Sequence, residues 1–166
     1  MDNAIFDIKD KQVFPIIIIN EGKEYLTLQY EDSDGVDTVL HKERIFYFDN
    51  MESLKDFCEK YGLILDEGVY THDLDKPIEN PVDYRYILDN WNLLNTVAST
   101  VGKRFEGDKR KYNPLYDLFF GMVTSSEDVP PKIELLPPHY KLLLKAFKNK
   151  NKLFKFFVPY KEQSNG

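Results

Sequence analysis

Residues 13–30 decide the fold, and they read VFPIIIINEGKEYLTLQY. Residues 13–19 are rich in Ile and Val, which favours a buried strand. Residues 20–23, Asn-Glu-Gly-Lys, are typical of a tight turn, and apolar side chains resume from Tyr25 to Tyr30. This order predicts two strands paired as a hairpin.

More strands and one helix are expected after the hairpin. Residues 31–35 form an acidic turn in which Gly35 can supply a positive φ, and residues 38–48 predict a third strand. Asp49 and Glu52 have the spacing of a capping box, which predicts a helix that ends at Gly62. Residues 63–65 suit a short strand, and residues 66–81 read as a polar loop, with a strand at 69–71 as an alternative.

Helical spacing dominates the rest of the chain. Apolar residues between 84 and 101 fall on one helix face, and Gly102 can end that helix. A second helix is expected at 114–122. A third is expected from Pro138, breaking at 149–151 and resuming through 153–157. Strands followed by helices predict a single α+β domain over residues 1–166. We expect an N-terminal antiparallel sheet of three to four strands, about four helices and a helical C-terminal half.

Composition indicates a folded protein. The chain has 166 residues, 42% of them hydrophobic and 14% aromatic, so it can bury a sizeable core. Its one cysteine excludes an internal disulfide. The N-terminus, Met1-Asp2-Asn3, lacks a basic segment followed by an apolar one, and the apolar run at 13–19 is too short to span a bilayer. We therefore expect a cytoplasmic protein that does not use a membrane.

Charge is distributed unevenly along the chain. Residues 1–100 hold 9 Lys and Arg against 21 Asp and Glu, whereas residues 101–166 hold 13 against 7. Such asymmetry indicates an electrostatic partner or attraction between the two halves within the fold.

Motifs for catalysis are sparse. Neither phosphate-loop pattern occurs, which argues against the common nucleotide enzymes. The turn holding Asp32 and Asp34 resembles a calcium loop, but position 37 is Asp where such a loop needs Gly. His72, Asp73 and Asp75 could hold a divalent ion only if the backbone bends, because an extended strand sends His72 to the opposite side from both carboxylates.

Cys58 is the remaining candidate nucleophile, with His41, His72 or His139 as its base. It lies on the apolar stripe of the predicted helix, beside Phe57, and free cysteine is usually buried. We therefore expect no catalytic residues, no metal and no cofactor, and a protein that is not an enzyme.

Two charged features indicate binding instead. Five lysines near the C-terminus recur at intervals of four and three and would form a basic stripe on a continuous helix: Lys141, Lys145, Lys148, Lys152 and Lys155. The alternative function is therefore a nucleic-acid-binding or regulatory protein that uses this helix. A solvated helix face whose aromatic side chains pack inward is the preferred explanation of the stripe.

The acidic surplus is the stronger indication. Residues 21–89 contain 18 acidic residues against 7 Lys and Arg, enough for a negative patch that attracts a basic partner. We expect the partner to contact residues on predicted turns and loops, with Tyr70 as an aromatic anchor and Trp91 in the core. The predicted partner-binding residues are Asp32, Asp34, Asp37, Glu67, Tyr70, Asp73 and Asp75.

Five segments carry a family resemblance: residues 44–49 (RIFYFD), 61–63 (YGL), 73–75 (DLD), 87–94 (ILDNWNLL) and 115–121 (LYDLFFG). Over residues 40–125 the chain resembles the immunity proteins of bacterial contact-dependent growth-inhibition systems. The resemblance implies a cytoplasmic inhibitor that forms a 1:1 complex with the C-terminal toxin domain of a large cell-surface protein. Such toxins are often nucleases, including transfer-RNA nucleases, and the inhibitor blocks the active site or substrate surface. The family supplies no fixed interface residues.

Overall fold

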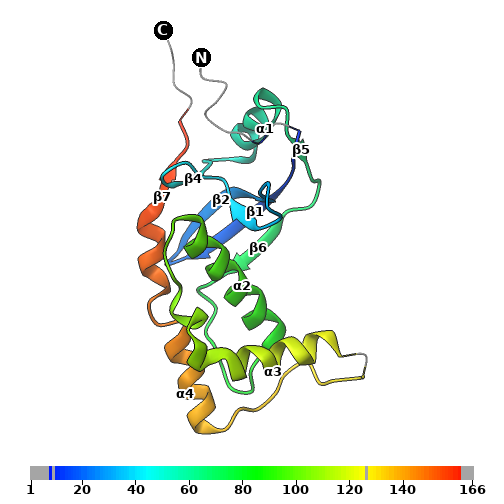
Figure 1. Ribbon diagram of the computed structural model, residues 1–166, viewed down its shortest axis with the longest axis vertical. Helices are drawn as coiled ribbons and strands as arrows, with labels where there is room; N and C mark the ends of the chain where they lie inside the picture. Colours follow the sequence, from blue (N-terminus) through cyan, green and yellow to red (C-terminus); the bar gives the residue numbers. More distant parts are fainter. Residues whose placement is uncertain (1–7, 9, 126, 162–166) are drawn as a thin grey trace.

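A mixed five-stranded sheet lies at the centre of the computed structural model, which describes residues 8, 10–125 and 127–161 (Figure 1). The strands are β1 (Gln12–Asn20), β2 (Lys23–Glu31), β3 (Asp37–Val39), β4 (Ile45–Tyr47), β5 (Ile64–Leu65), β6 (Tyr70–Asp73) and β7 (Phe157–Pro159). The α-helices are α1 (Met51–Lys60), α2 (Tyr84–Thr100), α3 (Asn113–Thr124) and α4 (Pro137–Ala146), with short 3₁₀ segments η2 (Glu106–Asp108), η3 (Arg110–Tyr112) and η4 (Lys150–Phe156). The α+β class is confirmed.

The predicted hairpin is confirmed. β1 and β2 pair antiparallel, in a register that runs from Phe14 opposite Gln29 to Asn20 opposite Lys23. Glu21 and Gly22 form the two-residue turn with φ of 51° and 73°. A turn with positive φ at both central residues matches the twist of the strands, and glycine takes the second position without strain.

The prediction of an antiparallel sheet is wrong for the strands that pair with β1 on the side away from β2. β5 and β6 both pair parallel to β1. The chain passes through α1 between β4 and β5, and such a crossover returns it in the same direction as β1. The polar composition and the Gly and Pro residues of 66–81 obscured β6, which extends two residues beyond the alternative strand at 69–71.

The single strand predicted at 38–48 is also wrong. The segment forms β3 and β4, joined by a turn that a bridge between His41 and Ile45 closes. Leu40 is fully buried, and its carbonyl accepts a hydrogen bond from the amide of Phe46 at 2.9 Å. The chain therefore folds back at Leu40, and β4 pairs parallel with β7 rather than joining the main sheet.

The ends of α1 and α2 are set by local sequence. Asn50, not Asp49, caps α1, because its side chain accepts a hydrogen bond from the amide of Ser53 at 2.8 Å. The capping box at Asp49 is therefore wrong by one residue. Gly62 and Gly102 follow α1 and α2 with φ of 65° and 70°, which confirms both predicted stops.

The C-terminal segment departs from the predicted helix. α4 ends at Ala146, and the chain continues as η4 and β7. The rings of Phe154 and Phe157 lie 5.2 and 4.9 Å from the ring of Tyr25 in β2. Both rings reach β2 because the chain leaves the helical path. Leu144 of α4 is 41% exposed.

Two apolar clusters cover the two sides of the sheet. One joins Val13 and Leu28 to α1 and includes the buried Cys58. The other joins Ile16 and Ile18 to α2, α3, α4 and the C-terminal segment. Trp91 lies at the centre of the second cluster with 1% exposure, as predicted. Its Nε1 donates to the carbonyl of Gly107 at 3.1 Å, which satisfies the only polar atom of the indole.

Candidate partner-binding site

One side of β1 changes from buried to open along its length. Ile18 and Ile16 are 0% and 2% exposed beneath α2, whereas Phe14 on the same side is 43% exposed. α2 reaches both edges of the sheet, because the Tyr70 hydroxyl donates to Asp89 at 2.5 Å and the hydroxyl oxygens of Thr38 and Thr100 lie 3.1 Å apart. It therefore crosses the sheet and leaves one end of this side uncovered.

The neighbouring strands add acidic side chains to this uncovered end. Phe14 lies opposite Gln29 in the β1–β2 register, and Glu31 follows on the same side of β2. Asp37 of β3 lies directly opposite Glu31, so the two carboxylates share one side of the sheet. In the part of the chain that the structure describes, neither carboxylate forms an ion pair or accepts a hydrogen bond. Like charges in directly opposed positions destabilise a strand pair.

β6 supplies an aromatic pair at the other end of the site. Tyr70 and His72 lie beside Ile16 and Ile18 in the parallel register, and their ring centroids are 4.7 Å apart. The hydrogen bond to the Asp89 carboxylate raises the pKa of the Tyr70 hydroxyl to about 12. Burial lowers the pKa of His72, although the charge of Asp89 opposes that shift. His72 is therefore predominantly neutral at pH 7.

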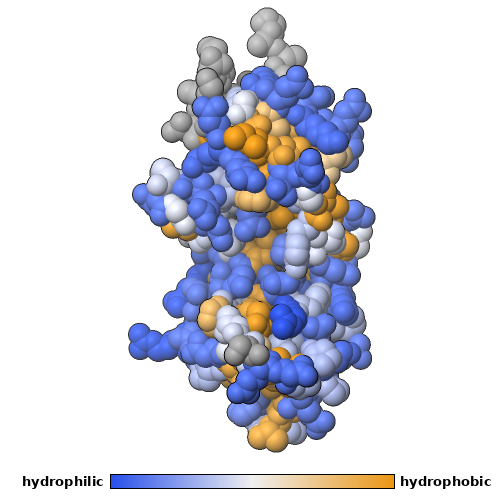
Figure 2. Space-filling model, turned by 90° about the vertical axis from the view of Figure 1, so that its right-hand side faces the viewer, coloured by the Kyte–Doolittle hydropathy of each residue, from blue (hydrophilic) through white to orange (hydrophobic). Residues whose placement is uncertain are grey.

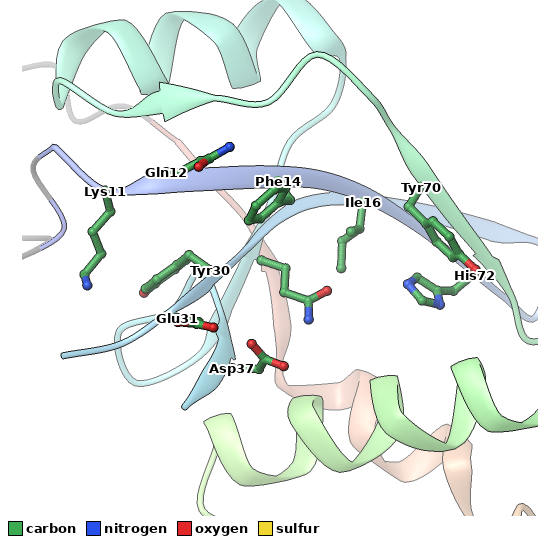
Figure 3. A pocket seen from close by; sticks show the side chains of 10 residues that line it. Lys11, Gln12, Phe14, Ile16, Tyr30, Glu31, Asp37, Tyr70 and His72 are labelled. Carbon is green, nitrogen blue, oxygen red and sulfur yellow. The ribbon is translucent and has the colours of Figure 1, made fainter. Parts of the chain in front are cut away.

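Together these strands form a pocket of about 710 Å³. We name it the open sheet face, made by residues 12–16 of β1, 29–31 of β2, 37 of β3 and 70–72 of β6. Figure 3 shows Lys11 at one end and Tyr70 and His72 at the other, with Phe14 between them and α2 along the near side. The open sheet face is thus an amphipathic surface with aromatic walls and two unpaired carboxylates.

Exposed apolar side chains surround the same region. Nine large apolar side chains are exposed among the described residues, and five belong to the sheet strands or the loops beside them: Phe14, Val36, Ile64, Val69 and Tyr70. Ile64 of β5 lies beside Gln12 and is 59% exposed. On the side of the molecule that faces the viewer in Figure 2, apolar patches are most frequent in the upper half and are bordered by hydrophilic side chains. Exposed apolar side chains gathered in one region are typical of an interaction site.

The structure brings only part of the predicted residue set together. Asp37 and Tyr70 line the open sheet face. Asp32 and Asp34 lie on the adjoining β2–β3 turn, where an Asp32 carboxylate oxygen accepts from the amides of Asp34 and Val36 at 2.8 and 3.0 Å. Asp32 therefore has a structural role in shaping the turn, and Asp34 is exposed beside the site.

The other three predicted residues lie away from the pocket. Glu67 is exposed on the β5–β6 loop. Asp75 holds the hairpin turn, because its carboxylate accepts from the amides of Glu21 and Gly22 at 2.6 and 2.8 Å. Asp73 accepts from the amide of Asp75 at 2.9 Å. Asp73 and Asp75 therefore stabilise the far end of β6.

Chemistry at the remaining candidates is limited. Cys58 is buried on α1 as predicted, and burial raises the pKa of its thiol to about 11, so it stays protonated at neutral pH. His72 and Asp73 alternate along β6, as expected of an extended strand. Over residues 8, 10–125 and 127–161, no three His, Cys, Asp or Glu side chains are grouped to hold a metal ion.

The lysine stripe is broken by the end of α4. Lys141 and Lys145 lie on the helix, Lys148 follows it, and Lys152 and Lys155 lie in η4. The stripe required a continuous helix, but the chain turns after Ala146, shortly before the break expected at 149–151, and brings its aromatic residues to β2.

A different basic group forms near the end of α4. Lys109 and Lys111 of the connector pair with Glu106 at 2.8 and 3.6 Å. Tyr112 also donates to Glu106 at 2.7 Å, and the lysine and tyrosine hydrogen bonds lower the pKa of that carboxyl to about 2. Lys111 lies close enough to Lys145 to lower its pKa. Three lysines thus surround one carboxylate.

Sequence reasoning missed Phe14, Glu31 and His72 as parts of one site. Alternation in β1 and β2 places Phe14, Gln29 and Glu31 on one side of the hairpin, and polar residues at two of these positions are a usable signal that the side is not fully covered. The contribution of β6 had no such signal, since its parallel pairing was not expected.

Comparison with known proteins supports only the fold. No family model matches the chain, and no curated protein matches it. Among solved structures, the C-terminal domain of SatS, described as a crystal structure in complex with bromine, is similar with a TM-score of 0.58. The alignment covers 89% of this chain and 94% of that one at 13% identity. The chain therefore shares its fold with that domain, and so low an identity carries no function across.

Within the described ranges, none of the helices has the length and apolar character needed to cross a bilayer.

Proposed function

We propose that this protein is an immunity protein that binds a toxin domain and blocks its active site or substrate surface. The toxin is a nuclease, with transfer-RNA nucleases as one class, and the complex forms 1:1 in the cytoplasm. The open sheet face is the contact surface. The observation that carries the proposal is that this surface combines exposed aromatic side chains with two unpaired carboxylates.

Charge complementarity supports a nuclease as the partner. A nuclease presents Lys and Arg where phosphates bind, and long-range attraction to an acidic surface speeds association. The acidic turn with Asp32 and Asp34 adjoins the open sheet face, and Glu67 lies on the loop before β6. Asp32 and Asp34 form part of the rim expected around an apolar centre, whereas Glu67 lies farther from the pocket.

Protection sets a requirement on the size of the interface. An inhibitor that acts at low toxin concentration needs a Kd of about 1 nM, or about −12 kcal/mol. Interfaces of that strength commonly bury about 800 Å² on each partner. The exposed residues Ile64 and Val69, beside the pocket-lining residues Gln12 and Tyr70, would add to the interface.

Binding to a toxin domain encoded next to this chain's gene is the direct test. Calorimetry should give a 1:1 complex, and addition of the protein should abolish cleavage of RNA by the toxin domain. Asp37→Lys should weaken the complex by at least about tenfold, because it reverses charge at the centre of the open sheet face. Glu52→Lys, on exposed α1 at the other side of the sheet, makes the same charge change and should have little effect. Absence of binding at micromolar concentrations would reject the function.

A nucleic-acid-binding function is the second candidate, and the close approach of Lys111 and Lys145 favours it. A bound phosphate would relieve the repulsion between these two ammonium groups. A gel shift with RNA at low salt that is lost in Lys111→Glu/Lys145→Glu would support this function. An unshifted RNA at low salt would reject it.

A further inference from the structure

The open sheet face contains a charge arrangement that the protein itself does not neutralise. Glu31 and Asp37 are opposed across the β2–β3 pair and project to the same side. Neither has a cationic partner within the described residues, and both are exposed. A cation placed between them would replace a repulsion by two attractions.

The walls of the pocket favour a flat cation. Phe14 and Tyr70 are 43% and 52% exposed and present aromatic surface on the same side of the sheet. A guanidinium stacks on aromatic rings and also donates in a fork to carboxylates, whereas an ammonium is compact and more strongly hydrated. The chemistry of the site therefore discriminates arginine from lysine.

The surroundings allow one such side chain to enter. The pocket of about 710 Å³ lies in the range of sites that admit small organic groups. Lys11 is the one Lys or Arg residue among those that line it, and Figure 3 shows Lys11 at the end away from Tyr70 and His72. Its charge offsets only one of the two carboxylates, so the lining remains net negative near neutral pH.

We propose that the open sheet face receives an arginine side chain from the protein partner, with Glu31 and Asp37 as its carboxylate ligands and Phe14 as its stacking surface. The occupant is thus an arginine-bearing segment of a basic protein. This inference rests on the proposed function and deepens it, because the arginine is one with which a nuclease would otherwise contact phosphate.

The test uses the whole chain, labelled with ¹⁵N, and the probe N-acetyl-arginine amide in an NMR titration to about 10 mM, a concentration suited to millimolar affinity. Amide shifts should concentrate in residues 12–16, 29–31, 37 and 70–72. N-acetyl-citrulline amide, which has nearly the same shape without the charge, should bind at least about tenfold more weakly. N-acetyl-lysine amide should bind between the two.

Variants should both weaken and strengthen the binding of the arginine probe. Glu31→Gln/Asp37→Asn should weaken the arginine probe at least about tenfold, whereas Lys11→Met should tighten it. Glu52→Gln/Glu59→Gln on α1 removes the same charge from the other side of the molecule and should change nothing. Equal binding of arginine and citrulline, shifts centred elsewhere, or no shifts at all would overturn the inference.

Failure of this inference is distinguishable from failure of the proposed function. A toxin complex that forms while the arginine probe leaves the spectrum unchanged rejects the arginine site and keeps the function. A probe that binds at the open sheet face while no toxin domain binds rejects the function and keeps the site.

Discussion

The two sides of the β1–β2 hairpin differ in how completely helices cover them. On the α1 side, Val13, Leu28 and Leu40 are each 0% exposed. On the α2 side, burial is complete at Ile18 and lost at Phe14, four residues earlier on the same strand. Val13 and Phe14 are neighbouring apolar residues of β1 that point to opposite sides of the sheet. Their different burial therefore arises from where the helices lie.

That difference assigns stability to one side and binding to the other. Apolar area on the α1 side is removed from water within the chain and contributes directly to folding. The uncovered end of the α2 side keeps aromatic and acidic side chains available, and its burial awaits a partner. Substitutions matched across the sheet should therefore separate the two contributions.

Truncating one residue on each side should give the largest contrast. Leu28→Ala removes fully buried atoms and leaves a cavity, so the free energy of unfolding should fall by about 2–5 kcal/mol. Phe14→Ala removes a half-exposed ring and should cost less than about 1 kcal/mol. Urea unfolding of both variants measures this. Equal losses would mean that the α2 side is covered in solution.

Affinity should show the reverse order. Tyr70→Ala should weaken the toxin complex by about 2 kcal/mol, since exposed aromatic residues at the centre of an interface dominate binding. Tyr61→Ala on the α1 side should lower stability, because Tyr61 packs against Phe57 with ring centroids 4.7 Å apart, and should leave affinity unchanged. Calorimetry of both variants compares the two sides. A loss of affinity in Tyr61→Ala alone would place the interface on the α1 side.

Acid should destabilise the α2 side through His72. Burial holds the pKa of His72 below its ordinary value of 6.5, so the unfolded chain binds a proton more readily than the folded chain. Stability from this residue is therefore present above pH 6.5 and is lost as the pH falls through the lower folded pKa. Asp89 faces His72 and reduces the effect.

The measurement is Tm as a function of pH. His72→Gln should flatten the decline of Tm below about pH 6.5. His139→Gln, at an exposed position on α4, should follow the unaltered protein. Parallel profiles for all three proteins would contradict a buried neutral His72.

The smallest expected effect is a gain in stability at the open sheet face. Asp37→Asn removes the repulsion with Glu31 and should stabilise the chain by about 0.2–1 kcal/mol. The gain should shrink in high salt, because both carboxylates are exposed and screened. Asp34→Asn, on the adjacent turn, is the control. A destabilised Asp37→Asn would show that Asp37 has a structural partner.

Local patterns in the sequence predicted the local elements well. The hairpin, the turn at Gly22 and the stops at Gly62 and Gly102 all follow from residues within a few positions of one another. Parallel pairing of β6 with β1 could not be read in the same way, since it depends on where a crossover returns the chain. The end of α4 depends likewise on Tyr25, more than a hundred residues earlier, which packs against Phe154 and Phe157.

The sequence indicated only part of the candidate site, because the site also depends on pairing between distant segments. Loop position favoured acidic residues that are exposed, and it selected Asp37 and Tyr70, which the structure places at the pocket. It could not distinguish them from Asp75, whose carboxylate accepts two backbone hydrogen bonds at the hairpin turn. An exposed carboxylate that already accepts hydrogen bonds from backbone amides, as that of Asp75 does, is less available to a partner.

The parallel pair of β4 and β7 has a consequence for how the chain folds. Ile45 pairs with Phe157, 112 positions further along, whereas the β1–β2 turn joins residues three positions apart. Closing so long a loop is entropically costly, so the hairpin should form early and the β4–β7 pair late. Until then Tyr25 lacks its contacts with the rings of Phe154 and Phe157. During synthesis the hairpin emerges from the ribosome before β7. The side of the hairpin that carries Tyr25 therefore stays partly exposed to water until the C-terminal segment has been made.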